Sequence, residues 1–246
     1  MSERYSHAPI MSAILEVQAE QNGSREEAFF HHDVSFEVPA YPTKQIIQGV
    51  EAQFTVNPTT FGTTVGTAAT QTQAGVLYQS SDRKQSFRLT PQGFTFVRLN
   101  PYENWDSFIF EARGIWERCL PHVKTVSRLG LRYINRLDLP LPIRDFKDYL
   151  RTVPEISPDM PQELSGMFMR VQLPFESDET QLFLTEAMIE PDRPEVISLV
   201  LDIDVSSVPK RYFVSKDMWN MFEQFRTIKN QVFEACITDR MRELIR

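Results

Sequence analysis

The chain has 246 residues, a formal net charge of −7 and no basic stripe, so nucleic acid is disfavoured as a partner. The length is sufficient to bury a large core without a disulfide or a metal. No apolar run approaches the roughly 20 residues that a membrane span requires, which excludes a membrane partner. The first residues lack the apolar stretch of a secretory signal, which predicts a cytoplasmic protein.

The first half of the chain is predicted to begin with a strand and to end with a helix. Alternating apolar residues indicate a strand over 8–19, and a short helix over 43–53 follows. A long helix over 102–120 stacks apolar residues at helical spacing and stops at Pro121. Three strands precede it, at about 75–80, 85–90 and 94–100.

Two segments of the first half are predicted to be irregular. Residues 20–42 are polar and interrupted by prolines, and His31-His32-Asp33 within them is the one clustered set of metal-ligand types. Adjacent histidines point to opposite sides of an extended chain, so a solvated loop is favoured over a metal site. Residues 55–75 carry no charge and are rich in Thr and Gly. They predict a mobile loop, either a lid or a tolerated insertion.

The second half repeats this order. A long strand is expected over 124–139 and a short helix over 144–151. A last helix over 216–245 would be the longest element and would form the spine of the core. Three strands lie between them, at 166–174, 180–190 and 195–205.

The two halves resemble each other. Both closing helices begin with Trp-x-x-Phe, at Trp105–Phe108 and Trp219–Phe222. We therefore predict an α+β protein made of two similar β-α-β-β-β-α halves, residues 1–122 and 123–246, in one inseparable domain. The halves would form one largely antiparallel sheet of about eight strands, with the long helices packed on one face.

The cysteines and tryptophans fall in the helical patterns. A disulfide between Cys119 and Cys236 is geometrically possible, but two buried thiols are the favoured interpretation. The three tryptophans could stack a planar ligand, but aromatic residues at helical spacing are more typical of a core. No phosphate-binding glycine motif or acyl-transfer serine motif is present, so no cofactor is expected.

Charged side chains recur at alternate positions of the predicted strands, which places them on one face of the sheet. Arginine binds carboxylate or phosphate in a bidentate manner, so such a face would suit a small anionic ligand or a partner segment. Alternatively, these charges pair with one another on a solvated surface, each pair contributing roughly 0.2–1 kcal/mol. The candidate binding residues are Arg98, Arg132, Arg136, Arg170, Asp202 and Asp204.

Lys229-Asn230 interrupts the apolar pattern of the last helix. The lysine could meet Asp202 or Asp204 at the end of the sheet, or it could lie on a solvated helical face. Asp202 and Asp204 share one strand face and could bind a divalent metal. No histidine, glycine-rich loop or nucleophile accompanies them, so the hypothesis of a metal-dependent enzyme ranks last.

Several phrases resemble a sporadically distributed family of uncharacterised bacterial proteins of about this length. They are Ala8-Pro9-Ile10, Phe94-Thr95-Phe96-x-Arg98-Leu99-x-Pro101-Tyr102-x-x-Trp105, Leu129-Gly130-Leu131-Arg132-Tyr133-Ile134-Asn135-Arg136, Leu201-Asp202-Ile203-Asp204 and Lys229-Asn230-x-x-Phe233-Glu234-Ala235-x-Ile237-Thr238-Asp239. The resemblance covers nearly the whole chain, and it implies no catalytic residue. A sporadic distribution is typical of genes on mobile or phage-defence islands, so the resemblance implies an accessory, antitoxin-like or immunity role.

Three functional hypotheses follow. The first is a non-catalytic binding or sensor module that uses the charged sheet face. The second is a protein that neutralises a partner protein, since an acidic chain suits a basic partner. The third is the metal-dependent enzyme, and a homodimer is left open in each case.

Overall fold

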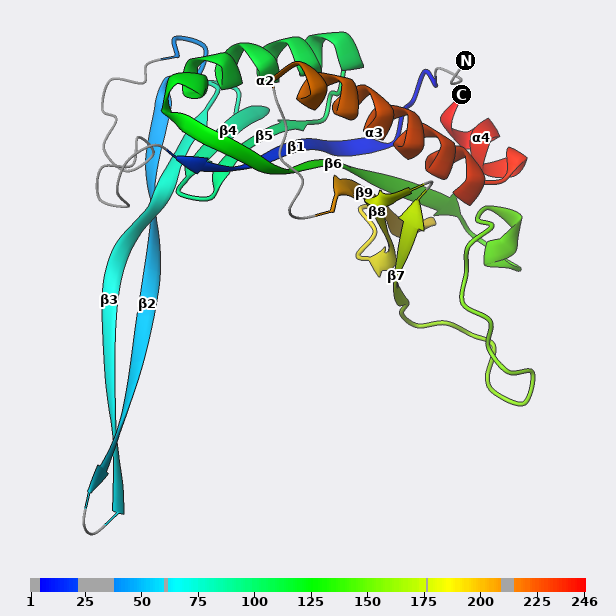
Figure 1. Cartoon of the computed structure of the whole chain (residues 1–246). Coiled ribbons are helices and arrows are strands. Elements are labelled where there is room, and N and C mark those ends of the chain that lie inside the picture. Colours follow the sequence, from blue (N-terminus) through cyan, green and yellow to red (C-terminus); the bar gives the residue numbers. More distant parts are fainter. Residues whose placement is uncertain (1–4, 22–37, 60–61, 176, 209–214) are drawn as a thin grey trace.

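The computed structural model describes residues 5–21, 38–59, 62–175, 177–208 and 215–246. In this part of the chain nine strands form one antiparallel sheet, in the order β2-β3-β4-β5-β1-β6-β9-β8-β7 (Figure 1). The α+β class and the single antiparallel sheet are confirmed, with nine strands in place of about eight. The strands are β1 (Ile10–Gln21), β2 (Thr43–Thr59), β3 (Gly62–Gln79), β4 (Gln85–Thr90), β5 (Gly93–Leu99), β6 (Val123–Pro140), β7 (Phe168–Phe175), β8 (Ser177–Ile189) and β9 (Val196–Ser207).

The centre of the sheet is the pair formed by β1 and β6, which run antiparallel with Leu15 opposite Leu131. Along the centre of both strands, alternate residues are buried and mostly apolar, including Ala13 and Leu129, with Asn135 as a buried polar exception. A shift of one residue would turn these side chains to the other face of the sheet, so the burial of one face fixes the register.

Residues 43–59 form the strand β2, so the prediction of a short helix over 43–53 is wrong. The prediction of a loop over 55–75 is wrong as well, because β2 pairs with β3 along its whole length. Only residues 76–79 of β3 pair with β4, and the rest of the hairpin projects from the sheet (Figure 1). Ile46 and Ile47 are β-branched, which favours strand over helix, and threonine likewise suits a strand.

The short helix predicted over 144–151 is a single 3₁₀ turn, Phe146–Asp148, which Asp145 caps through a 2.8 Å bond from the Lys147 amide. Within the described residues, the short α-helix predicted for each half is therefore absent. The polar segment 20–42 falls mostly on residues 22–37, which lie outside the described residues together with His31-His32-Asp33.

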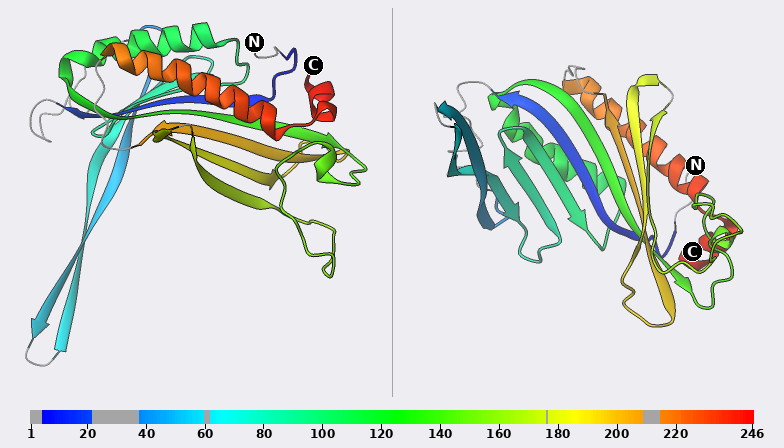
Figure 2. Two further views of the ribbon diagram at one scale, coloured as in Figure 1. Left: turned by 45° about the vertical axis from the view of Figure 1, so that its right-hand side comes forward. Right: turned by 90° about the horizontal axis from the view of Figure 1, so that it is seen from below.

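Three helices occur in the described residues: α2 (Trp105–Cys119), α3 (Ser215–Cys236) and α4 (Asp239–Ile245). Helices α2 and α3 lie on the same side of the sheet (Figures 1 and 2), where α2 contacts β5 and α3 contacts β6 and β9. Asn104 caps α2, because its side chain accepts a 2.8 Å hydrogen bond from the Ser107 amide.

The last helix does not run unbroken over 216–245. It ends at Cys236, where Ile237 forms a bridge with Leu150 and Thr238 becomes the N-cap of α4. The Thr238 hydroxyl accepts from the Met241 amide at 3.3 Å, which satisfies one of the free amides of the new helix.

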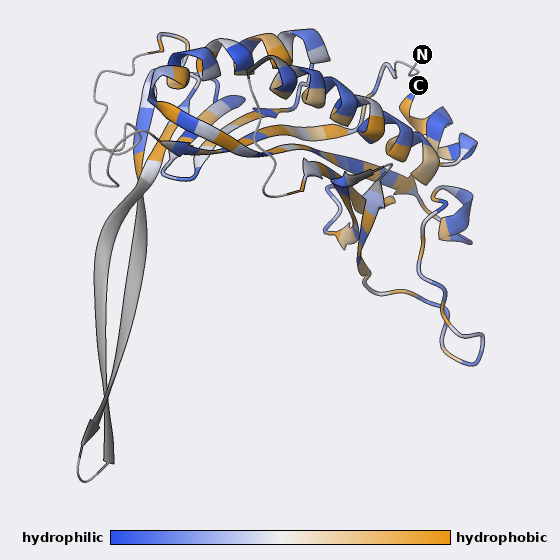
Figure 3. Cartoon of the chain, in the orientation of Figure 1, coloured by the Kyte–Doolittle hydropathy of each residue, from blue (hydrophilic) through white to orange (hydrophobic). Residues whose placement is uncertain are grey.

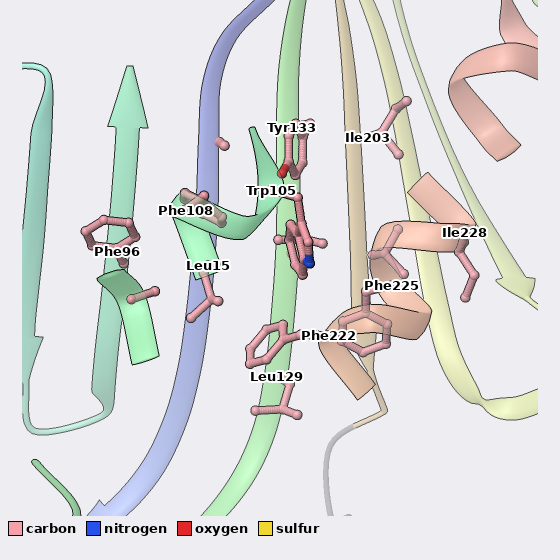
Figure 4. Close-up of a cluster of buried hydrophobic side chains, with 14 of the residues drawn as sticks. Leu15, Phe96, Trp105, Phe108, Leu129, Tyr133, Ile203, Phe222, Phe225 and Ile228 are labelled. Carbon is pink, nitrogen blue, oxygen red and sulfur yellow. The ribbon is translucent and has the colours of Figure 1, made fainter. Parts of the chain in front are cut away.

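The core lies between these helices and the sheet. Figure 3 shows hydrophobic residues alternating with hydrophilic ones along the strands. Aromatic rings from both layers meet in Figure 4, where Phe96 lies 5.3 Å from Phe108 between ring centroids. Trp105 and Trp116 are buried in this core. Cys119 and Cys236 are buried free thiols, so the disulfide alternative is wrong.

Candidate functional site

Alternation along β6 and β9 divides their side chains between two faces. Leu131 and Tyr133 are fully buried under the helices, while Arg132 and Arg136 point to the opposite face. We call this opposite face of the sheet the outer face. It carries most of the charged residues that the sequence predicts as a site.

Arg132 and Asp202 form the central ion pair of the outer face. The guanidinium donates from Nε to Oδ1 at 2.8 Å and from Nη2 to Oδ2 at 2.6 Å, a bidentate geometry. Asp204 is the residue directly opposite Arg132 in the register, so Arg132 reaches diagonally to Asp202. Both oxygens of Asp202 accept from Arg132, so the guanidinium already balances the negative charge that would attract a metal ion. No cluster of three metal-ligand residues occurs within the described ranges.

Asp204 and Arg170 differ from this pair. In the described part of the chain neither makes a hydrogen bond or an ion pair. Burial raises the pKa of the Asp204 carboxyl, and the nearby carboxylates of Asp202 and Glu16 add to this effect, against the opposing influence of Arg128 and Arg132. The Arg170 guanidinium lies 4.8 Å from the centroid of the Phe183 ring, a cation–π contact that leaves its donors unused.

Four of the six predicted residues line one small cavity of about 200 Å³. We call it the outer-face cavity. Its charged lining is Arg132, Arg170, Asp202 and Asp204, and Phe168, Phe183 and Thr185 complete it. These three residues were not predicted from the sequence, although Phe168 shares a strand face with Arg170, Thr185 is opposite Arg170, and Phe183 is opposite Asp204 in the register.

Arg136 lies on the same face but belongs to a separate network. Its guanidinium donates to Asp138 at 3.0 Å, to Ser198 at 3.0 Å and to Asp192 at 2.7 Å. The Ser198 hydroxyl donates to Asp138 at 2.6 Å, and these bonds lower the pKa of Asp138. This network is satisfied within itself, so Arg136 does not contribute to the outer-face cavity.

Arg98 is on the other side of the sheet, so its prediction as a member of the charged face is wrong. It follows Phe94 and Phe96 at alternate positions of β5 and is 5% exposed beneath α2. Its Nη1 donates to the Ser107 hydroxyl at 2.8 Å and its Nη2 pairs with Glu111. Arg98 therefore attaches α2 to the sheet.

Two other charged residues also lie on the helix side. Lys229 lies over the ring of Tyr133, so the alternative in which it meets Asp202 or Asp204 is wrong, because those aspartates are on the outer face. Glu186 is 1% exposed, opposite Leu201, and both of its carboxylate oxygens lack a hydrogen bond. Burial raises the pKa of Glu186 to about 7.

No protein-family model, no curated protein and no solved structure matches this chain. The resemblance drawn from the sequence phrases therefore stays a prediction. None of the helices in the described residues has the length and apolar composition needed to cross a membrane.

Proposed function

We propose that the protein is a non-catalytic binding module whose outer-face cavity receives an anionic group of a partner segment. The observation that carries this proposal is the combination of four charged side chains from β6, β7 and β9 in one cavity. Arg170 keeps its hydrogen-bond donors free there, and Asp202 holds Arg132 in a fixed orientation. Two arginines at one point suit a carboxylate or a phosphate, which accepts from each planar fork.

The size of the cavity favours a partner segment over a free metabolite. Small-molecule sites enclose roughly 300–1,000 Å³, whereas the outer-face cavity has about 200 Å³. This space suits one side chain or one anionic group. Phe168, at the rim of the cavity, is 74% exposed and offers an apolar contact to the chain that carries the group.

The outer-face cavity lies on the second half of the sheet. We infer that the two halves of the sheet arose by duplication of one unit. In support, β5, β4 and β3 flank β1 in the same order as β9, β8 and β7 flank β6. Each trio is followed by a helix with Trp-x-x-Phe near its start, at Trp105–Phe108 in α2 and at Trp219–Phe222 in α3. Strand β2 has no counterpart in the second half. On this inference residues 1–122 and 123–246 form a single domain with both long helices on one face.

A second candidate function is the neutralisation of a partner protein, in the manner of an antitoxin or immunity protein. The observation that favours it is the β2–β3 hairpin, which pairs along 17 residues of β2 and projects beyond β4. A projecting hairpin offers a partner more contact surface than the sheet edge alone does. The net charge of −7 suits a basic partner.

Peptide binding tests the first candidate. Fluorescent extended peptides of alternating Asp and Ser, Lys and Ser, or Asn and Ser are titrated with the protein at 0.15 M salt, and anisotropy is measured. At this salt the Debye length is about 8 Å, so long-range repulsion by the net charge is screened. We expect the acidic peptide to bind best, and Arg170→Gln to weaken it about tenfold, about 1.4 kcal/mol.

The matched control is Arg113→Gln, which removes an exposed arginine of α2 on the other side of the sheet and leaves the affinity unchanged. Equal binding of the acidic and neutral peptides would contradict the proposal, as would an Arg170→Gln variant that binds like the wild type. Preference for the basic peptide would favour the neutralisation of a basic partner.

A further inference from the structure

A second and larger cavity lies on the helix side of the sheet. It encloses about 1,080 Å³ between the N-terminal segment, the segment that leads into α2, the strand β6 and the helix α3. We call it the helix-face cavity. Its volume reaches the upper end of the range for small-molecule sites, and the outer-face cavity lies across the sheet from it.

Four phrases that the sequence analysis singles out meet at this cavity. Its lining includes residues from 8–10, 100–105, 133–135 and 229–234. These segments lie far apart in the sequence, and the proposed binding function does not use them. In the structure all four segments line the same cavity.

Lys229 brings a positive charge to the wall of the cavity. Its ammonium nitrogen lies 4.0 Å from the centroid of the Tyr133 ring, and in the described residues it has no hydrogen bond or ion pair. The nearest carboxylate on the same helix, Glu234, already accepts from Tyr5 at 2.8 Å and from Arg242 at 2.9 Å. Lys229 therefore faces the cavity as a cation without an anion.

Aromatic side chains contribute part of the cavity wall beside Lys229. The rings of Tyr102 and Tyr133 meet edge to face at 5.5 Å, and their hydroxyls are joined by a 2.7 Å hydrogen bond. Burial raises the pKa of Tyr102 to about 12, so its phenol stays neutral at physiological pH. Phe233 adds an apolar surface from α3. A flat apolar body fits against such walls.

We propose that the helix-face cavity binds a small molecule that joins one carboxylate or phosphate to a planar apolar body, with Lys229 holding the anion. Arg226, one turn earlier on α3, offers a second cation and lies 5.4 Å from the centroid of the Trp105 ring. Its bond to Glu223 is long, at 3.5 Å, so the guanidinium can turn toward an anion.

The protonation of Lys229 couples to this binding. Burial, followed by repulsion from Arg226, lowers the pKa of Lys229 to about 7, and Glu234 opposes this shift. A bound anion favours the ammonium, so binding takes up a proton, and affinity falls about tenfold per pH unit above pH 7. The titratable groups that face the cavity from the elements around Lys229 are Tyr133, Arg226, Glu234, Tyr102, Glu103, Asp106, Tyr5 and His7.

Labelling with pyridoxal 5′-phosphate tests the proposal, because this probe carries a planar ring, a phosphate and an aldehyde. The neutral amine of a lysine condenses with the aldehyde and releases water. Borohydride then delivers hydride to the imine carbon while solvent supplies the proton to nitrogen, and peptide mass spectrometry locates the product. At pH 7.5 we expect Lys229 to be modified at least ten times faster than the exposed Lys124.

Protection experiments test the chemistry of the ligand. Indole-3-carboxylate and phenyl phosphate should slow the labelling of Lys229, and benzyl alcohol should not. Arg170→Gln should leave the labelling unchanged, which separates this result from the outer-face cavity. The proposal is overturned if Lys229 stays unmodified while Lys124 reacts, or if the neutral alcohol protects as well as the anions do.

Discussion

On the outer face, Arg132 and Asp202 are paired by two hydrogen bonds, with the arginine half-exposed and the aspartate buried. Under the helices, Lys229 and Glu186 have no ion pair within the described residues, and burial moves both pKa values to about 7. The two faces therefore differ in how an ionised side chain affects the stability of the fold. A pair held by solvent-accessible hydrogen bonds contributes modestly to stability, whereas a charge buried alone destabilises the fold at the pH where it is ionised.

Lys229→Met should produce the largest change. Between pH 7 and pH 10.5 the unfolded chain keeps a proton on Lys229 that the folded chain has lost, so wild-type stability rises with pH through this window. We expect the rise to amount to roughly 3–4 kcal/mol, after a discount for partial exposure, and to disappear in the variant. Urea unfolding across this pH range measures it. Parallel pH profiles for the two proteins would show that Lys229 is not buried as described.

Glu186→Met tests the opposite sign. Between pH 4.5 and pH 7 the folded chain holds a proton on Glu186 that the unfolded chain has released, so wild-type stability falls as pH rises through this window. The variant should lack this fall and should exceed the wild type by roughly 3 kcal/mol at pH 8. Chemical unfolding at pH 4.5 and pH 8 gives the comparison. A variant that is less stable at both pH values would mean that Glu186 has a partner.

Asp202→Ala should have a smaller effect, with a loss of about 1 kcal/mol, because Arg132 is half-exposed and can turn to Asp204. Asp204→Asn is the matched change, and it should raise the melting temperature slightly, because it removes a carboxylate whose ionised form burial disfavours. It should also tighten binding of the acidic peptide by removing a repulsive charge. Calorimetry and anisotropy measure the two effects, and equal losses of stability in both variants would contradict the difference between the two aspartates.

Glu117→Ala should change the free energy of unfolding least. Glu117 pairs with Arg113 at 2.9 Å on α2, and both side chains are more than half exposed. The expected change in the free energy of unfolding is below about 0.5 kcal/mol. A larger loss, measured in the same urea series, would mean that exposed pairs stabilise this protein more than the comparison assumes.

Local pattern predicted the parts of the site where one face of a strand is apolar. The alternation of β6 and β9 placed Arg132, Asp202 and Asp204 together, because the neighbouring residues Leu131, Tyr133, Leu201 and Ile203 are hydrophobic and buried on the other face. The same alternation, followed from Phe94 through Phe96, puts Arg98 under α2, so the sequence already indicates the correct face for Arg98.

Other features depend on contacts between distant residues and could not be predicted from local pattern. The β2–β3 hairpin contains Thr, Gly and Gln, whose propensities allow loop or strand, and its pairing decides between them. The helix-face cavity needs four segments that only the fold brings together. The break before α4 could be predicted from the sequence, because Thr238 is a typical N-cap residue and Asp239 is typical of a first helical turn.

The most direct test of the binding proposal observes the arginine side chains themselves. The NMR signals of the Arg132 and Arg170 Nε–H groups are followed while the acidic peptide is added, with Arg113 as the internal control. The account predicts that the signals of Arg132 and Arg170 shift together and saturate at one peptide per chain, while that of Arg113 does not move. Binding of the peptide without a shift at Arg132 or Arg170 would contradict it.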